Sequence, residues 1–232
     1  MEDINCGDFH IHSEYSPSHY YSGYACKSNI LDILKIAKKN GLNAIAVTDH
    51  NKIKGSLLAE KLSKKIGVIA IPSMEISSKQ GHILAYNVTE KINPKQNYLD
   101  TIDLIREMGG LAVCAHPLMK VFSVGKKRIP FFDGVECFNS RQNKLVPSHL
   151  IDDGQFVVAG TDAHTLDEIG RVVTTLNGGF ETKDDLLELF IKKKTSYKIL
   201  KRTSKRKDVI VPQIKNIAHF YRDRINGNGR KH

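Results

Sequence analysis

Short apolar runs rich in β-branched residues alternate along the chain with longer stretches in which apolar residues recur every three or four positions. The short runs predict strands at 6–10, 44–48, 68–72, 82–86, 111–115, 134–138 and 156–160. The longer stretches predict a helix that begins at Ser28 and ends before Gly41, and further helices at 56–66, 98–108, 144–152 and 184–193. This alternation is typical of βα units around a mainly parallel sheet or barrel, so we expect an α/β fold.

The basic residues are concentrated at one end of the chain. Residues 192–232 hold fourteen Lys and Arg against two acidic residues, so the net charge of +10 comes from this segment. We therefore predict one domain at 1–190 and a short basic C-terminal extension at 191–232. Apolar residues at helical spacing, among them Ile214 and Ile217, indicate that the extension is partly helical. Such a segment could contact nucleic acid, or it could be a solvated surface.

No part of the sequence looks like a membrane segment. No stretch approaches the roughly 18 consecutive apolar residues that a membrane span requires. The N-terminal sequence MEDINCGDFHIH contains two acidic residues before position 4 and no apolar core of a signal peptide. We therefore expect a cytoplasmic protein without a membrane partner.

Polar residues cluster along the predicted strands, and nearly all of them lie at or just after a C-terminal strand end. In a (β/α) barrel these strand ends share one face, and the active site is built there. Residues more than 150 positions apart are therefore expected to meet. The residues concerned are Asp8, His10, His12, Thr48, Asp49, His50, Asn51, Glu75, His82, His116, Glu136, Asp162 and His164.

Imidazole nitrogens and carboxylate oxygens at this density are the ligands that a divalent-metal site requires. His10 and His12 are two positions apart in an extended segment, so they point to the same side, and Asp162 and His164 repeat that spacing. A carboxylate such as Glu75 could bridge two ions, which could hold a shared hydroxide. This chemistry favours hydrolysis of a phosphoester. A single histidine at a strand end is usually structural, but the whole set is not explained by independent core histidines.

The motifs DFHIHS, VTDHN, EIS followed by HILA, AHP and GTDAH occur in this order, and the chain from about residue 6 to 176 resembles the PHP (polymerase and histidinol phosphatase) superfamily. The resemblance implies a distorted seven-stranded (β/α)7 barrel that hydrolyses phosphoesters with two or three divalent ions, Mn²⁺, Zn²⁺ or Fe²⁺. It implies that one ion is held by His10, His12, Glu75 and Asp162. A second ion would share Glu75 and take His82 and His116, and a third would use His50 and His164.

One position departs from the pattern of the superfamily. Many relatives follow the HxH motif with a turn whose aspartate supplies a ligand to the third ion, and the matching position here is Pro17. His19, in the same loop, could take the place of that ligand or could be a surface histidine.

Further candidates concern catalysis and substrate binding. We expect catalytic roles for Glu75 and for His50 or His164, either of which could protonate the leaving group. Asp49 could orient an imidazole or could cap a helix. Side chains that could bind the phosphate are Arg141, Arg171, Lys120 and Arg128, and each arginine could equally be a surface charge.

Three functions remain open from the sequence. The first is a phosphatase that acts on a small phosphomonoester, such as a nucleotide or a sugar phosphate. The second is a metal-dependent nuclease, supported by the segment KKKTSYKILKRTSKRK, in which Tyr197 is interleaved with cations. The third is a non-catalytic nucleic-acid-binding protein. The sequence has no nucleophile elbow, P-loop or dinucleotide-binding glycine motif, which argues against serine hydrolases, NTPases and dinucleotide oxidoreductases.

Overall fold

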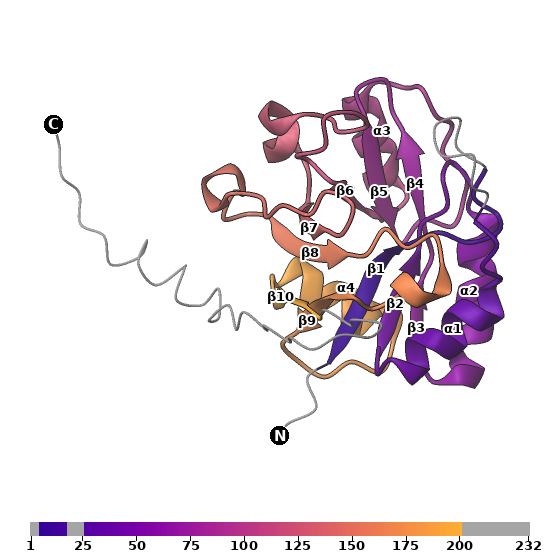
Figure 1. Cartoon of the computed structure of the whole chain (residues 1–232). Coiled ribbons are helices and arrows are strands. Elements are labelled where there is room, and N and C mark those ends of the chain that lie inside the picture. Colours follow the sequence, from indigo (N-terminus) through magenta and orange to yellow (C-terminus); the bar gives the residue numbers. More distant parts are fainter. Residues whose placement is uncertain (1–4, 18–25, 201–232) are drawn as a thin grey trace, which may run out of the picture.

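The computed structural model describes residues 5–17 and 26–200, which form a mixed α/β fold with two five-stranded sheets (Figure 1). The first sheet has the order β10-β9-β1-β2-β3, with strands at Cys6–Ile11 (β1), Ala44–Val47 (β2), Ile69–Ile71 (β3), Val172–Leu176 (β9) and Thr195–Ile199 (β10). The second has the order β4-β5-β6-β7-β8, with strands at Ser73–Ser77 (β4), His82–Tyr86 (β5), Leu111–Cys114 (β6), Gly134–Asn139 (β7) and Phe156–Gly160 (β8).

The α/β class predicted from the sequence is confirmed, but strand pairing is less regular than in an ideal barrel. Strands β1, β2 and β3 are parallel, as are β6, β7 and β8, whereas β4, β5 and β6 pair in antiparallel fashion. Two isolated parallel bridges, Ile11 with Ala163 and His50 with Glu75, connect the two sheets. The pairing of the described strands shows two sheets and does not show a closed (β/α)7 barrel.

Four α-helices are found in the described part of the chain: Ile30–Lys39 (α1), Lys54–Ile66 (α2), Tyr98–Glu107 (α3) and Lys183–Ile191 (α4). Helix α1 starts after Asn29, whose side chain accepts a hydrogen bond from the backbone N–H of Asp32. The helix predicted at 144–152 is wrong, because only the 3₁₀ turn Ser148–Leu150 forms there. Pro147 lacks a backbone donor and disfavours helical backbone at Val146, which prevents an α-helix through this segment.

The first sheet continues into the segment that the sequence analysis assigns to the basic extension. Strand β10 pairs in antiparallel fashion with β9, from Thr195 opposite Leu176 to Ile199 opposite Val172. The sheet therefore includes residues beyond position 190, because Tyr197 and Ile199 pack against apolar residues of β7 and β8. The helix expected further along the extension lies outside the described residues.

An aromatic cluster fills the interior below the strand ends that carry the polar residues. Phe190 of α4 lies edge-on to Phe9 and stacks on Phe156, with ring centroids 5.1 Å apart in both pairs. Tyr86 is also fully buried, and its hydroxyl donates to the carbonyl of Phe9 at 2.8 Å. This packing fixes β1, β5 and β8 relative to one another, so the residues at their ends are held in place. In residues 5–17 and 26–200, no helix has both the length and the apolar character needed to cross a membrane.

Candidate metal centre

The structure brings together all eight residues that the sequence analysis proposes as metal ligands, which we call the cluster. They come from six strands or the residues just after them, and all except His164 are buried. Two depart from the expected position after a strand, because Glu75 lies in the middle of β4 and His82 is the first residue of β5. The cluster consists of His10, His12, His50, Glu75, His82, His116, Asp162 and His164. His19, the candidate replacement in the loop after β1, lies outside the described residues.

The carboxylate of Glu75 lies at the middle of the cluster and faces imidazoles on two sides. Its Oε1 is 2.8 Å from His82 Nδ1 and 3.0 Å from His116 Nε2. Its Oε2 is 2.9 Å from His50 Nδ1, 3.3 Å from His12 Nε2 and 3.4 Å from His10 Nε2. Each oxygen is therefore directed at a different set of nitrogens, which is the arrangement expected of a carboxylate that bridges two ions.

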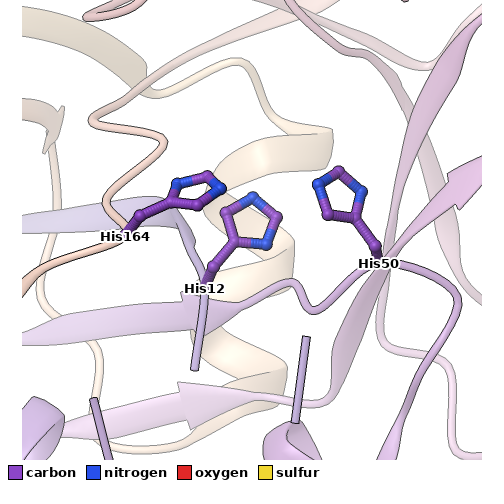
Figure 2. A group of neighbouring side chains, drawn as sticks. All are labelled: His12, His50 and His164. Carbon is purple, nitrogen blue, oxygen red and sulfur yellow. The ribbon is translucent and has the colours of Figure 1, made fainter. Parts of the chain in front are cut away.

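Three overlapping groups of ligand atoms lie close enough to hold ions. The groups are His10 with His12 and Asp162, His50 with Glu75 and His82, and His12 with His50 and His164, and the ligand atoms within each group lie within 4.8 Å of one another. Figure 2 shows the third group, in which the imidazole ring of His12 lies between those of His164 and His50, each from a different segment. The group shares His12 with the first group and His50 with the second, and one imidazole nitrogen can bind only one ion, so the groups are alternatives at these two residues.

The buried polar atoms of the cluster fit divalent cations. His10 Nε2, His12 Nε2 and Glu75 Oε2 are buried and form no hydrogen bond of acceptable geometry with any described residue. Leaving such atoms unsatisfied in the interior costs free energy, and native proteins rarely do so without a bound water, ion or functional reason. Imidazole nitrogen and carboxylate oxygen are the donors that Zn²⁺, Mn²⁺ and Fe²⁺ accept, so the donor set agrees with the geometry.

Strong mutual electrostatic effects operate in the cluster. Burial alone would raise the pKa of Glu75, but the imidazoles of His50, His82 and His10 hold it well below its usual range. Burial likewise lowers the pKa of His10, but carboxylates that include Glu136 and Asp162 outweigh it, and the pKa of His10 is raised well above its usual value. The carboxylates also raise the pKa of His116 despite its burial, so metal ions and protons compete for the nitrogens of His10 and His116.

Comparison with known proteins identifies the family. A family model described as PHP domain matches residues 8–116, and a second, described as PHP-associated, matches residues 156–195. A curated protein of Methanocaldococcus jannaschii, the uncharacterized protein MJ1587, is 36% identical over 138 residues, which are 57% of this chain and 81% of the relative. This chain belongs to the PHP family.

Solved structures with a similar fold include PHP proteins and a nuclease. A two-domain protein from Bacteroides vulgatus that contains a predicted PHP-like metal-dependent phosphoesterase has a TM-score of 0.66 and 16% identity; the match covers 86% of this chain but only 66% of that protein. Endonuclease Q of Pyrococcus furiosus has a TM-score of 0.61 and 18% identity, with 82% of this chain and 56% of the endonuclease covered. PsfC from Pseudomonas syringae has a TM-score of 0.60 and 16% identity, with 95% and 98% covered. At these identities the likenesses concern the fold.

A buried carboxylate, Glu136 of β7, orients one histidine of this PHP centre. It is fully buried, and its Oε1 lies 2.9 Å from His10 Nδ1 while its Oε2 accepts a 2.6 Å hydrogen bond from the backbone N–H of His116. Because a carboxylate only accepts, His10 carries its proton on Nδ1 and directs Nε2 at the other cluster atoms. Gly160 allows this close approach, since a Cβ there would collide with His10. The sequence analysis noted Glu136 at its strand end but assigned it no role.

Two further supporting residues, Ser16 and Asn139, were missed. Ser16 Oγ lies 3.2 Å from His12 Nδ1 and accepts a hydrogen bond from the backbone N–H of His50 at 3.2 Å. Asn139 donates to Glu136 Oε1 at 2.9 Å and lies 3.4 Å from Asp162 Oδ2. Short polar residues of this kind belong to no motif, and only the strand-end position of Asn139 could have indicated it.

Asp49 supports the backbone around the cluster. Its two oxygens accept hydrogen bonds from the backbone N–H and the hydroxyl of Ser13, both at 2.6 Å. Burial raises the pKa of Asp49 to about 6, although the hydrogen bonds from Ser13 oppose this. The expectation that Asp49 orients an imidazole is not what these hydrogen bonds show, because they fix the turn after β1 instead. The next residues are held by Asn51, which exchanges two hydrogen bonds with Ser77 of β4.

Two cluster residues have unusual backbone conformations. His116 has φ +27° and Asp162 has φ +54°, and each lies two residues after the end of a strand. Positive φ is uncommon for residues with a side chain and persists only where surrounding contacts impose it. The fold therefore accepts local strain in order to direct these two side chains into the cluster.

The four proposed phosphate-binding residues differ in their surroundings. Arg141 lies beside the cluster: its Nε donates to the carbonyl of Asp162 at 2.8 Å, and 41% of its side chain is exposed. Arg171 is paired with Asp167, and Arg128 lies over the ring of Tyr98 at 5.3 Å. Lys120 is exposed on the loop after β6. Of the four, Arg141 is the one placed by a hydrogen bond to a cluster residue.

Proposed function

We propose that this protein is a divalent-metal-dependent phosphoesterase that hydrolyses a phosphomonoester, such as a nucleotide or another small phosphate. The observation that carries the proposal is the position of Glu75, whose two oxygens face different sets of imidazoles in a buried cluster with unsatisfied nitrogen atoms. Two or three ions of Mn²⁺, Zn²⁺ or Fe²⁺ would suit this donor set. When bound, such ions lower the pKa of a coordinated water and neutralise charge on phosphoryl oxygens.

The side chains of the cluster divide into ligands and their supports. We assign one ion to His10, His12 and Asp162 with Glu75 Oε2, and a second to His82 and His116 with Glu75 Oε1. A third ion would use His50 and His164, because His12 has a single nitrogen directed into the cluster and cannot bind two ions through it. Glu136 and Ser16 keep His10 and His12 in orientations that direct Nε2 into the cluster.

His164 suits a ligand role better than the role of proton donor. Its Nδ1 lies 2.9 Å from the carbonyl oxygen of Asp162, which can only accept, so Nδ1 carries the proton. Burial lowers the pKa of His164 despite the nearby Asp162 carboxylate, so the ring is neutral at neutral pH and its Nε2 presents a lone pair. The alternative role of His164 as general acid is therefore less favoured.

Arg141 is our candidate for binding the substrate phosphate. Its hydrogen bond to Asp162 fixes one edge of the guanidinium beside the cluster, and the side chain remains partly exposed. A guanidinium in this position offers further N–H donors in a fork that matches two phosphate oxygens.

A nuclease is the second candidate. Its support is the basic composition of residues 192–232 and the likeness of the fold to endonuclease Q, for which a structure with a 27-mer duplex substrate exists. In the described part of that segment, however, Tyr197 is half-buried against apolar residues of β7 and β8, and burial raises its pKa to about 12. Tyr197 therefore stabilises the sheet, which weakens the proposal that it stacks on single-stranded bases.

The test is incubation of the whole protein with Mn²⁺ and either a set of small phosphomonoesters or a 5′-phosphorylated single-stranded oligonucleotide. Release of free phosphate without shortening of the oligonucleotide supports the phosphatase. Mononucleotides would instead establish the nuclease. Absence of any product with Mn²⁺, Zn²⁺ and Fe²⁺ would overturn both and favour the non-catalytic alternative.

A further inference from the structure

A loop after β6 places an aromatic ring directly beside the cluster. Phe122 stacks on the imidazole of His82, with ring centroids 5.0 Å apart and an angle of 19° between the rings. The backbone N–H of His82 also donates to the carbonyl of Phe122 at 2.7 Å. Two independent contacts therefore fix Phe122 to a residue that the proposed function assigns to a metal ion.

The loop holds this ring at a conformational cost. Phe122 has φ +68°, in the left-handed region that a bulky residue rarely adopts. The backbone of Ser123 and Val124, which follow Phe122, packs so closely on Gly81 that a Cβ at Gly81 would collide with it. The hydroxyl of Ser123 also donates a hydrogen bond to the carbonyl of Pro117 at 2.8 Å. A strained and tightly held residue next to a candidate active site indicates a functional constraint on its position.

Phe122 is also partly exposed, which simple core packing does not explain. Phe122 is 38% exposed and Val121 is 60% exposed, whereas the side chain of His82 beneath the ring is 8% exposed. Lys120 precedes them on the same loop and is exposed as well. A fixed, partly exposed aromatic residue on a loop that also carries an exposed cation suits a ligand with a planar group and a phosphate.

We propose that Phe122 determines specificity by stacking on the base of a nucleotide whose phosphate lies at the cluster. This inference rests on the proposed phosphoesterase function and narrows its substrate to nucleotides. Stacking accepts every base because each has a π-face, so the loop selects nucleotides over sugar phosphates without selecting one base.

The test compares adenosine 5′-monophosphate with ribose 5-phosphate as substrates in Mn²⁺, using the wild type, Phe122→Leu and Phe131→Leu. Leucine keeps apolar cover over His82 but removes the aromatic face. We expect Phe122→Leu to lower kcat/KM for the nucleotide about 10-fold, mainly through KM, as the loss of one base–aromatic contact predicts. The value for ribose 5-phosphate should change less than about twofold. Phe131 is a matched control, since it is 46% exposed but packs on Tyr98.

An equal loss for both substrates would overturn the proposal and reduce Phe122 to a cover for His82. No loss for either substrate would overturn it as well. A 5′-phosphorylated trinucleotide, tested in parallel, shows whether the base belongs to a mononucleotide or to a chain end. Calorimetric binding of adenosine 5′-monophosphate separates the base site from the phosphoesterase function on which it rests. Binding that depends on Phe122, without any turnover, would retain the base site and refute the phosphoesterase. Hydrolysis of ribose 5-phosphate as fast as the nucleotide would support the phosphoesterase and refute the base site at Phe122.

Discussion

Replacement of Glu136 by glutamine should weaken metal binding although Glu136 belongs to none of the three ligand groups. Its Oε1 faces two donors, His10 Nδ1 and the Asn139 amide, and its Oε2 faces a third, the backbone N–H of His116. Glutamine has the same shape but one of its two positions is an NH₂ group, so a donor must point at a donor. The negative charge that holds the proton on His10 Nδ1 is also lost.

The size of the effect follows from the role of Glu136. Loss of a carboxylate that supports a metal-binding histidine typically lowers metal affinity about 10- to 100-fold. At an Mn²⁺ concentration about 100 times the wild-type Kd, bound metal stabilises the wild type by about 2.7 kcal/mol, and the variant would lose about 1.3 to 2.3 kcal/mol of this. For a chain of this length, the rise in Tm on adding Mn²⁺ should then be about 3 to 9 °C smaller. The unsatisfied donor should also destabilise the metal-free protein by about 1 to 3 kcal/mol.

Thermal unfolding in EDTA and in Mn²⁺, together with calorimetric titration of Mn²⁺, measures both effects. Asp133→Asn is the matched control, because Asp133 also accepts a hydrogen bond from a backbone N–H of β6, that of Ala112 at 2.8 Å, but pairs with Arg106 rather than with a cluster histidine. The control should lose stability in EDTA and keep the full metal-induced rise in Tm. If Glu136→Gln also keeps that rise and its Kd for Mn²⁺ stays within about twofold of the wild type, the orienting role is refuted.

Three further predictions concern the cluster and its edge. Glu75→Gln should lower turnover by more than about 100-fold in a phosphate-release assay while circular dichroism shows an intact fold, because the charge between two sets of imidazoles disappears; full activity would contradict the bridging role. Arg141→Lys should raise KM about 10-fold with a small change in kcat, since lysine lacks the fork that binds two oxygens; unchanged steady-state kinetics would remove Arg141 from the substrate site. Burial lowers the pKa values of His10 and His116, but nearby carboxylates outweigh it and raise them, so Mn²⁺ must displace protons and bind more tightly as pH rises from about 6 to 8. Calorimetry in buffers of different ionisation heat should show proton release, and pH-independent affinity without release would contradict this.

Most of the cluster could be predicted from the sequence because six of its eight residues lie at or just after the C-terminal end of a strand; Glu75, within β4, and His82, at the start of β5, do not. A polar residue at the end of an apolar run, such as His10 or Asp162, can be recognised in the sequence alone. Parallel strands then bring these ends together on one face. The partners of these residues could not be predicted in the same way. His10 and Glu136 are 126 positions apart, and only the packing of β1 beside β8, to which β7 is paired, shows that they are in contact. Asp49 illustrates the reverse error, since its neighbour His50 belongs to the cluster but its own carboxylate binds Ser13.

Local sequence also misjudged elements whose structure depends on tertiary contacts. Lysines precede, interrupt and follow the segment 195–199, and this charge places the segment in the predicted extension. In the structure Tyr197 and Ile199 pack against apolar residues of β7 and β8, and the segment forms β10 of the first sheet. The surface cations were equally difficult to assign. A guanidinium near a predicted active face can bind phosphate, but Arg171 pairs with Asp167 four positions earlier, and Arg128 covers Tyr98. Charge alone therefore does not identify a substrate-binding arginine.

The strained backbone and the unsatisfied atoms of the cluster have a common physical explanation. Positive φ values at His116, Asp162 and Phe122 cost conformational free energy, and the buried Nε2 atoms of His10 and His12 form no hydrogen bond with any described residue. Costs of this kind persist only where surrounding contacts impose them, and they gather at functional sites. Their concentration around one carboxylate, Glu75, is expected if bound cations offset them together. On this argument the metal-loaded protein is the state for which the backbone is shaped, and folding stability and metal affinity should change together in variants of the cluster.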